Sequence, residues 1–225
     1  MRAVVLAVSV LVAAPTLSAC RRESGGAVVS FTTKDGIRLA AEEFGSGRRG
    51  VVLAHGSDTD KRSWRSYAHA LASAGHHVVV FDFRGYGGSG GERRPAQIDR
   101  DVVAAVEYLK QKGSTGVVAV GAAMGGLACL KAAAVTTVKG VATLSTPLEY
   151  MGLRIDSSLA SVFSPKLFLA GEGDPASVAA GEFLLETAPE PRSLLTYNID
   201  AVGVGLLRDL RAAQDLTAFI DNSLG

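Results

Sequence analysis

The sequence predicts an α/β fold in which an N-terminal β-hairpin is followed by a mostly parallel sheet with helices on both faces. Two patterns indicate this class. Apolar runs such as Val51–Ala54 and Val78–Phe83 are continuous, as in strands that are buried on both faces. These runs alternate with longer helical segments, and repeated strand–helix units form a parallel sheet through right-handed crossovers. With 48% hydrophobic and 20% charged residues in 225, the composition is typical of one globular domain.

The first predicted elements are a hairpin and two helices. The β-like runs Ala27–Thr33 and Ile37–Phe44 flank Lys34-Asp35-Gly36, a sequence typical of a hairpin turn. One helix is expected over Arg62–Ala74, between the two buried strands, and a second over Pro95–Lys112. The second helix has proline in its first turn and glycine directly after its end. Its apolar residues recur every three to four positions, at Ile98, Val102, Val106 and Leu109.

The rest of the sequence continues the alternation of strands and helices. Ligands of open α/β sheets bind at the carboxyl ends of the strands, so a site is expected there. About twenty residues separate Leu144 from Lys166, which leaves room for only a minimal cap over that site. Strands are expected at Gly116–Val120, Val138–Leu144, Lys166–Ala170 and Ser193–Ile199, and helices at Met124–Val135, Ala176–Thr187 and Leu206–Asn222.

The N-terminal segment predicts export and lipid attachment. Arg2 precedes an apolar run from Ala3 to Ala14, which is shorter than the roughly 20 residues of a membrane span and fits a signal peptide. Leu17-Ser18-Ala19-Cys20 resembles the bacterial lipobox, so we expect residues 1–19 to be removed and Cys20 to carry lipid. Residues 20–26 would then tether a domain over 27–225 to a bacterial membrane, outside the cytoplasm. The alternative is an ordinary secretory signal with a chance cysteine.

Charge and cysteine usage narrow the function classes. A formal net charge of +1 gives no strong field, so nothing favours nucleic acid as a partner. With Cys20 assigned to lipid, Cys129 is left unpaired and is expected to be a small buried residue. His69, His76 and His77 have no third ligand at metal spacing. We therefore expect neither a metal nor a cofactor.

Three stretches carry a resemblance to a known family. Leu53-Ala54-His55-Gly56 is followed by Trp64, and Phe81-Asp82-Phe83-Arg84-Gly85-Tyr86-Gly87-Gly88-Ser89-Gly90 follows the next strand. Gly121-Ala122-Ala123-Met124-Gly125-Gly126 comes between a predicted strand and a predicted helix. In this order they are similar to the oxyanion loop, the D-x-R-G-x-G-x-S loop and the nucleophile elbow G-x-S-x-G of the α/β-hydrolase family. The resemblance covers nearly all of residues 27–225 and implies the α/β-hydrolase fold.

The glycine loop over residues 85–90 also satisfies G-x-G-x-x-G, the fingerprint of a dinucleotide site. In such a site the helix begins within the glycines, so that its N-terminus meets the pyrophosphate. Here residues 91–94 intervene before the next helix. The hydrolase loop therefore explains the pattern better than a nucleotide site does.

The resemblance implies that two of the three catalytic positions have lost their function. Ala123 stands at the position of the nucleophilic serine, and Val202 stands where the histidine base should follow the last strand. No histidine occurs beyond His77, so no alternative alignment supplies a base after the acid. Asp174 fills the acid position, although it is also a good N-cap for the following helix. The family's oxyanion hole would use the backbone N–H groups of Ser57, or its neighbour, and Met124.

These substitutions favour a non-catalytic function. The leading hypothesis is a pseudoenzyme that uses the cleft or the domain surface to bind a small apolar or acyl ligand or a protein partner. The runner-up is a weak or rewired ester or amide hydrolase that uses Ser145 or Ser57 with His55. A third possibility is an envelope-assembly lipoprotein whose cleft has filled in.

Overall fold

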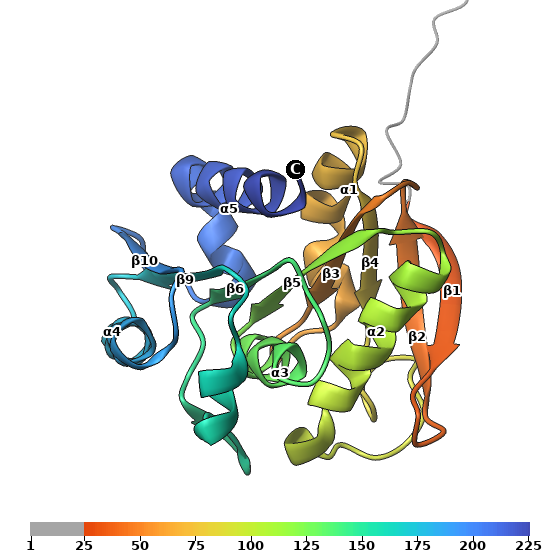
Figure 1. Cartoon of the computed structure of the whole chain (residues 1–225), viewed down its shortest axis with the longest axis horizontal. Helices are drawn as coiled ribbons and strands as arrows, with labels where there is room; N and C mark the ends of the chain where they lie inside the picture. Colours follow the sequence, from red (N-terminus) through yellow and green to blue (C-terminus); the bar gives the residue numbers. More distant parts are fainter. Residues whose placement is uncertain (1–24) are drawn as a thin grey trace, which may run out of the picture.

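The computed structural model describes residues 25–225, so the predicted signal peptide, Cys20 and most of the tether lie outside the described part. The strands β1, β2, β4, β3, β5, β6, β9 and β10 form one sheet in this spatial order (Figure 1). β2 pairs antiparallel with β1 and β4, and the other pairs are parallel. This confirms the predicted fold class. The strands are β1 (Ala27–Thr32), β2 (Arg38–Phe44), β3 (Arg49–Ala54), β4 (His77–Phe81), β5 (Gly116–Ala122), β6 (Gly140–Leu144), β9 (Lys166–Gly171) and β10 (Arg192–Tyr197).

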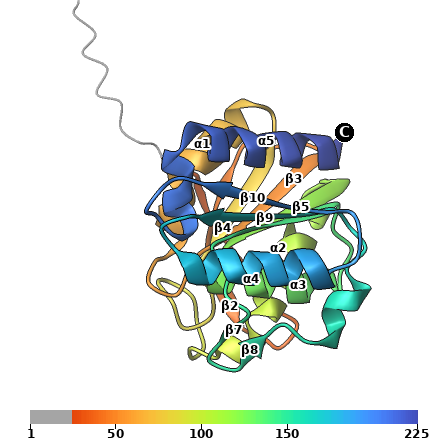
Figure 2. The same ribbon diagram turned by 90° about the vertical axis from the view of Figure 1, so that its left-hand side faces the viewer.

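Helices cover both faces of this sheet (Figures 1 and 2). On one face lie α1 (Arg65–Ser73) and α5 (Leu210–Leu224), and on the other lie α2 (Asp99–Gln111), α3 (Met124–Ala133) and α4 (Pro175–Thr187). Both apolar clusters that these helices form with the sheet are built from residues within the described range 25–225.

The strands divide their side chains between two apolar clusters. In β3, Val52 and Ala54 pack with the cluster of α2 and α3, whereas Val51 and Leu53 pack with the cluster of α1 and α5. Side chains that follow each other in a strand point to opposite faces, so a strand covered on both sides is apolar throughout. Cys129 is fully buried in the first cluster, as predicted, and burial raises the pKa of its thiol.

Each of three predicted helices is divided into a 3₁₀ turn followed by an α-helix. The turns are η1 (Lys61–Trp64) before α1, η2 (Pro95–Gln97) before α2 and η4 (Gly203–Arg208) before α5. The single helix predicted over residues 206–222 is therefore wrong. Asp209 has an extended backbone between η4 and α5, and its carboxylate caps α5 by accepting the N–H groups of Arg211 and Ala212.

The segment between β6 and β9 is short, as the sequence indicates, and it contains three small elements that were not predicted. β7 (Glu149–Tyr150) and β8 (Leu153–Arg154) form a two-stranded hairpin, and η3 (Ser157–Ser161) follows it. Elements this short lack a periodic pattern in the sequence. Within residues 25–225, no helix is both long enough and apolar enough to cross a membrane.

Candidate functional site

The turn between β5 and α3 keeps the backbone of a nucleophile elbow. Ala123 has φ 48° and ψ −118°, a backbone conformation that residues other than glycine rarely adopt. Its N–H donates to the carbonyl of Leu144 at 2.9 Å. A Cβ at Gly121 would overlap the carbonyl of Gly125, and one at Gly125 would lie 2.6 Å from the carbonyl oxygen of Ala54. Close packing around the two glycines thus holds the turn tight although its central side chain is a methyl group.

The loop after β3 lies directly against this elbow. A Cβ added at Gly56 would lie 3.6 Å from the Cβ of Ala123. The N–H groups of Ser57 and Met124, which the resemblance assigns to the oxyanion hole, donate to no acceptor among the described residues. Met124 is the first residue of α3, where the helix leaves its N–H groups unpaired and the macrodipole is positive. Both donors are therefore free to bind a ligand oxygen.

Asp174 serves as the N-cap of α4. Its carboxylate accepts the backbone N–H of Ser177 at 3.3 Å and also the Ser177 hydroxyl in a shorter bond. This confirms the capping role that the sequence suggested. The turn still lies near the position of the missing base, because the N–H of Gly173 donates to Ile199 at 3.2 Å. The acid position is thus occupied by a carboxylate that already has a structural task.

Val202 lies at the start of η4, and its isopropyl group is 58% exposed. It lines the same cavity as Ala122 and Ala123. The structure therefore brings together, in one cavity, the two apolar residues that the resemblance assigns to the nucleophile and base positions. Neither residue has a group that exchanges a proton.

His55 does not act as the base of a rewired site. Its Nδ1 lies 2.6 Å from the carbonyl oxygen of Gly56, and its Nε2 lies 3.1 Å from the backbone nitrogen of Phe83. A carbonyl only accepts and an N–H only donates, so the ring is a neutral imidazole with its proton on Nδ1. The side chain is fully buried, and burial lowers its pKa. With both nitrogens bound to the backbone, His55 cannot activate Ser57 or Ser145.

Ser145 lies at the carboxyl end of β6 in a left-handed conformation, with φ 50°. Its backbone N–H donates to Leu169 at 2.8 Å, and its side chain is buried. Its Oγ has no hydrogen-bond partner among the described residues. A nucleophilic serine requires a base within hydrogen-bond reach, so this hydroxyl lacks what the runner-up hypothesis needs.

The buried carboxylate of Asp82 fills the glycine loop that follows β4. Asp82 is fully buried and accepts hydrogen bonds from the N–H of Lys61 at 3.0 Å and the N–H of Gly88 at 2.9 Å. Gly87 has φ 47°, and a Cβ there would overlap the carboxylate of Asp82. The carboxylate, which is also paired with the Lys61 ammonium at 2.6 Å, already occupies the loop and its Gly88 N–H donor, so it leaves no place for a phosphate there. This agrees with the preference for the hydrolase loop over a dinucleotide site. Within residues 25–225, no three His, Cys, Asp or Glu side chains gather to hold a metal.

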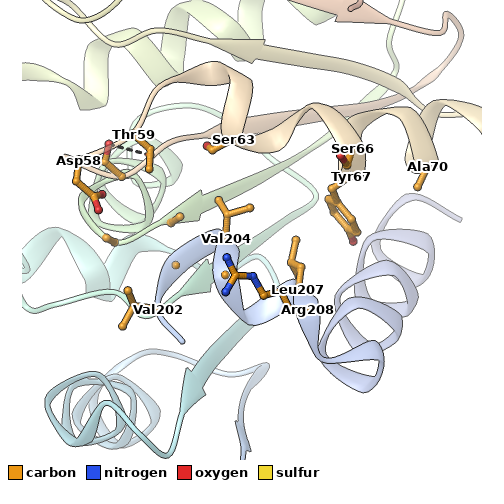
Figure 3. A pocket seen from close by; sticks show the side chains of 15 residues that line it. Asp58, Thr59, Ser63, Ser66, Tyr67, Ala70, Val202, Val204, Leu207 and Arg208 are labelled. Carbon is orange, nitrogen blue, oxygen red and sulfur yellow. Dashed lines mark hydrogen bonds between the residues drawn. The ribbon is translucent and has the colours of Figure 1, made fainter. Parts of the chain in front are cut away.

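A cavity of about 600 Å³ opens beside the elbow, beyond the carboxyl ends of β3 and β5. Figure 3 shows side chains of α1 along one wall and side chains of η4 along the other. This volume lies in the range of small-molecule sites, roughly 300–1,000 Å³. The cleft is therefore open, and the hypothesis of a filled cleft is wrong. The residues that line it include Asp58, Ser66, Val202, Val204, Leu207 and Arg208.

The α1 and η4 walls of this cavity were missed in the sequence analysis. Ser63, Ser66, Tyr67 and Ala70 recur at spacings of three and four, so they share one face of η1 and α1. This face has small and hydroxyl side chains, an available indication that it borders a cavity. No comparable pattern marks η4, whose contribution depends on how it packs on the face of the sheet that α1 and α5 also cover.

Comparisons with known proteins agree with this geometry. Residues 51–222 match a family model described as the alpha/beta hydrolase family. An uncharacterised protein of Mycobacterium tuberculosis is 30% identical over 208 residues, covering 80% of this chain and 73% of that protein. Epoxide hydrolase A of the same species is 47% identical over 66 residues, or 29% of this chain and 20% of the enzyme. The match to epoxide hydrolases thus spans about a fifth of their length.

Among solved structures, an esterase of Pyrococcus furiosus has the same fold. It superposes with a TM-score of 0.75 at 19% identity, over 90% of this chain and 92% of the esterase. At this level of identity the likeness concerns the arrangement of the chain and not its chemistry.

Proposed function

Because this chain belongs to the α/β-hydrolase family and has the fold of that family, we propose that it is a non-catalytic member that binds a small apolar or acyl ligand. The single observation that carries this proposal is the side-chain chemistry of the cavity. Ala123 and Val202 line it at the nucleophile and base positions, and a methyl or isopropyl group cannot attack a carbonyl or take a proton. Loss of either group removes most of the triad's contribution to the rate.

The preserved backbone supports binding rather than decay of the site. Gly121 and Gly125 still provide the clearance that the elbow needs, and the N–H groups of Ser57 and Met124 remain unpaired. These donors suit a carbonyl or carboxylate oxygen of a ligand. The cavity volume favours a small molecule over a protein partner, because it lies in the range that encloses most of a small ligand's surface.

Ester hydrolysis by purified residues 21–225 tests the proposal. We expect the wild type to release nitrophenol from p-nitrophenyl butyrate no faster than a heat-inactivated sample. The double variant Ala123→Ser, Val202→His should gain measurable hydrolysis, while Ala123→Ser alone, which lacks a base, should stay inactive. Activity of the wild type above the inactivated control would contradict the proposal.

The bonds of Asp174 suggest a refinement of this experiment. Its carboxylate is held by Ser177, so a new histidine at position 202 would lack a free acid to orient it. Adding Ser177→Ala to the double variant should therefore raise kcat further. Ser177→Ala in the wild type serves as the control and should not produce activity.

We also propose that the protein is lipid-anchored through Cys20, outside the cytoplasm of a bacterial cell. The topology then indicates which way the cavity would face relative to the membrane. β1 begins beside the end of β2, where Phe44 pairs with Val78 at the start of β4. The cavity lies at the opposite edge, beyond the carboxyl ends of β3 and β5. A tether before β1 would thus direct the cavity away from the membrane, towards ligands in the aqueous space.

A further inference from the structure

Among the described residues that line the cavity, Arg208 is the only one with a basic side chain. It lies at the end of η4, the turn that begins next to Val202. Figure 3 shows its guanidinium beside Val204 in the cavity, away from the body of α5. The position of η4 therefore places a permanent positive charge on the wall of the open cavity, where Arg208 is exposed.

The chain does not neutralise this charge. Arg208 forms no hydrogen bond or ion pair with any residue from 25 to 225, whereas the nearby Arg62 is paired with Asp60 at 2.6 Å. The adjacent carboxylate of Asp209 accepts two N–H groups at the start of α5. Asp58 also lines the cavity, but it makes no ion pair with Arg208. The guanidinium thus retains its full capacity to bind an anion.

The surrounding wall combines apolar surface with one more free donor. Val202, Val204 and Leu207 supply the apolar part. Across from η4, the hydroxyl of Ser66 has no hydrogen-bond partner among the described residues. A ligand that satisfies this wall has one polar, negatively charged end and an apolar body.

We propose that Arg208 binds the carboxylate of an amphiphilic monocarboxylic acid whose apolar chain lies along Val204 and Val202. The inference rests on the proposed function, since it specifies the ligand class of the same cavity. A carboxylate fits because a guanidinium binds its two oxygens in parallel hydrogen bonds. A single negative charge fits better than a doubly charged phosphate, because Asp58 repels additional charge.

Three probes separate charge from apolar contact in residues 21–225. Decanoate has both features, decanol has the chain without the charge, and acetate has the charge without the chain. We expect decanoate to bind at least about tenfold more tightly than decanol, the effect of one charge-assisted hydrogen-bonded pair, and acetate to bind weakly. Calorimetry gives the affinities. NMR shifts of the Val202, Val204 and Leu207 methyl groups report whether a probe occupies this cavity.

Arg208→Gln should remove the preference for decanoate without changing decanol binding, and Arg208→Lys should retain part of it. Arg211→Gln is the matched control, because Arg211 is an exposed residue of the next helix and does not line this cavity. Equal binding of decanoate and decanol by the wild type, or an unchanged preference in Arg208→Gln, would overturn the role of Arg208 while leaving the binding function intact. Failure of both long-chain probes to shift the cavity methyls would overturn the proposed function and this inference together.

Discussion

The Nε2 atom of His55 accepts a hydrogen bond from the backbone N–H of Phe83 at 3.1 Å. Through its other ring nitrogen, the same imidazole binds the carbonyl of Gly56. One buried side chain thus connects the loop after β3 to the loop after β4. In a cleft without a base, the histidine nearest to the elbow has a structural role.

Replacing this histidine should weaken the fold. His55→Leu leaves the buried N–H of Phe83 without an acceptor and removes the 2.6 Å bond to the carbonyl of Gly56, which keeps only the longer bonds from Thr59. We therefore expect the free energy of unfolding to fall by about 1–3 kcal/mol. Urea denaturation at pH 8 measures the change in residues 21–225. Ser73→Ala, at an exposed position at the end of α1, is the control and should change stability by less than about 0.5 kcal/mol. A midpoint for His55→Leu equal to the wild-type value would show that the bridge is dispensable.

The pH dependence of stability should reveal the same histidine. Burial lowers the pKa of both His55 and His76 below the ordinary value of 6.5. Between the folded and unfolded pKa values the unfolded chain binds more protons, so stability is complete above pH 6.5 and decreases as the pH falls towards the folded values. The slope is at most about 1.4 kcal/mol per pH unit for each histidine.

Urea midpoints measured from pH 8 to pH 5 test this dependence. In His55→Leu the contribution of His55 is removed while that of His76 remains, so its stability should decrease less steeply than that of the wild type. Parallel curves for the two proteins would show that His55 does not titrate differently on folding.

The elbow still has the backbone of a catalytic serine, and glycine should relieve its strain. At a φ of 48°, Ala123 is strained by about 1–3 kcal/mol, while glycine costs about 0.5–1 kcal/mol in chain entropy. We expect Ala123→Gly to stabilise the fold by about 1 kcal/mol in thermal unfolding. Ala122→Gly, in the regular strand next to it, should destabilise the fold by a similar amount. Changes of the same sign in both variants would contradict this account of the strain.

Membrane attachment should depend on a single thiol. In a bacterial host, the full chain should incorporate labelled fatty acid and sediment with membranes, while Cys20→Ala should do neither. Cys129→Ala is the matched control and should leave labelling unchanged, because that thiol is buried in the core. Labelling that persists in Cys20→Ala would place the lipid elsewhere or exclude the lipoprotein hypothesis.

The strands and the elbow could be predicted because their causes are local. A strand covered on both faces must be apolar at every position, and β3 and β4 are fully buried apart from Arg49. The glycines around Ala123 indicate a turn with no room for Cβ atoms, and the structure contains that turn. The missing base was also clear from the sequence, because no folding can supply a histidine that the chain lacks after His77.

The separation of the last predicted helix into η4 and α5 could not be predicted from the sequence. Leu206 is buried and fits the helical pattern that continues into α5, but the backbone of Asp209 is extended and its side chain caps the second segment. One continuous helix and two segments separated by a capping residue both satisfy the apolar spacing. Packing of η4 and α5 on the sheet favours two segments separated at Asp209, and this separation turns η4 towards the cavity.

The sequence by itself determined the α/β class, the glycine spacing of the turn around Ala123 and the lack of any histidine after His77, because hydrophobic periodicity, glycine spacing and residue type are local properties. Only the tertiary structure decided that His55 bridges two loops, that the cleft is open and that Arg208 lies in it without a counter-charge. Those properties depend on contacts between residues far apart in the chain. Such contacts form only when the folded sheet brings α1 and η4 together beside the carboxyl ends of the strands. No local sequence pattern encodes that arrangement.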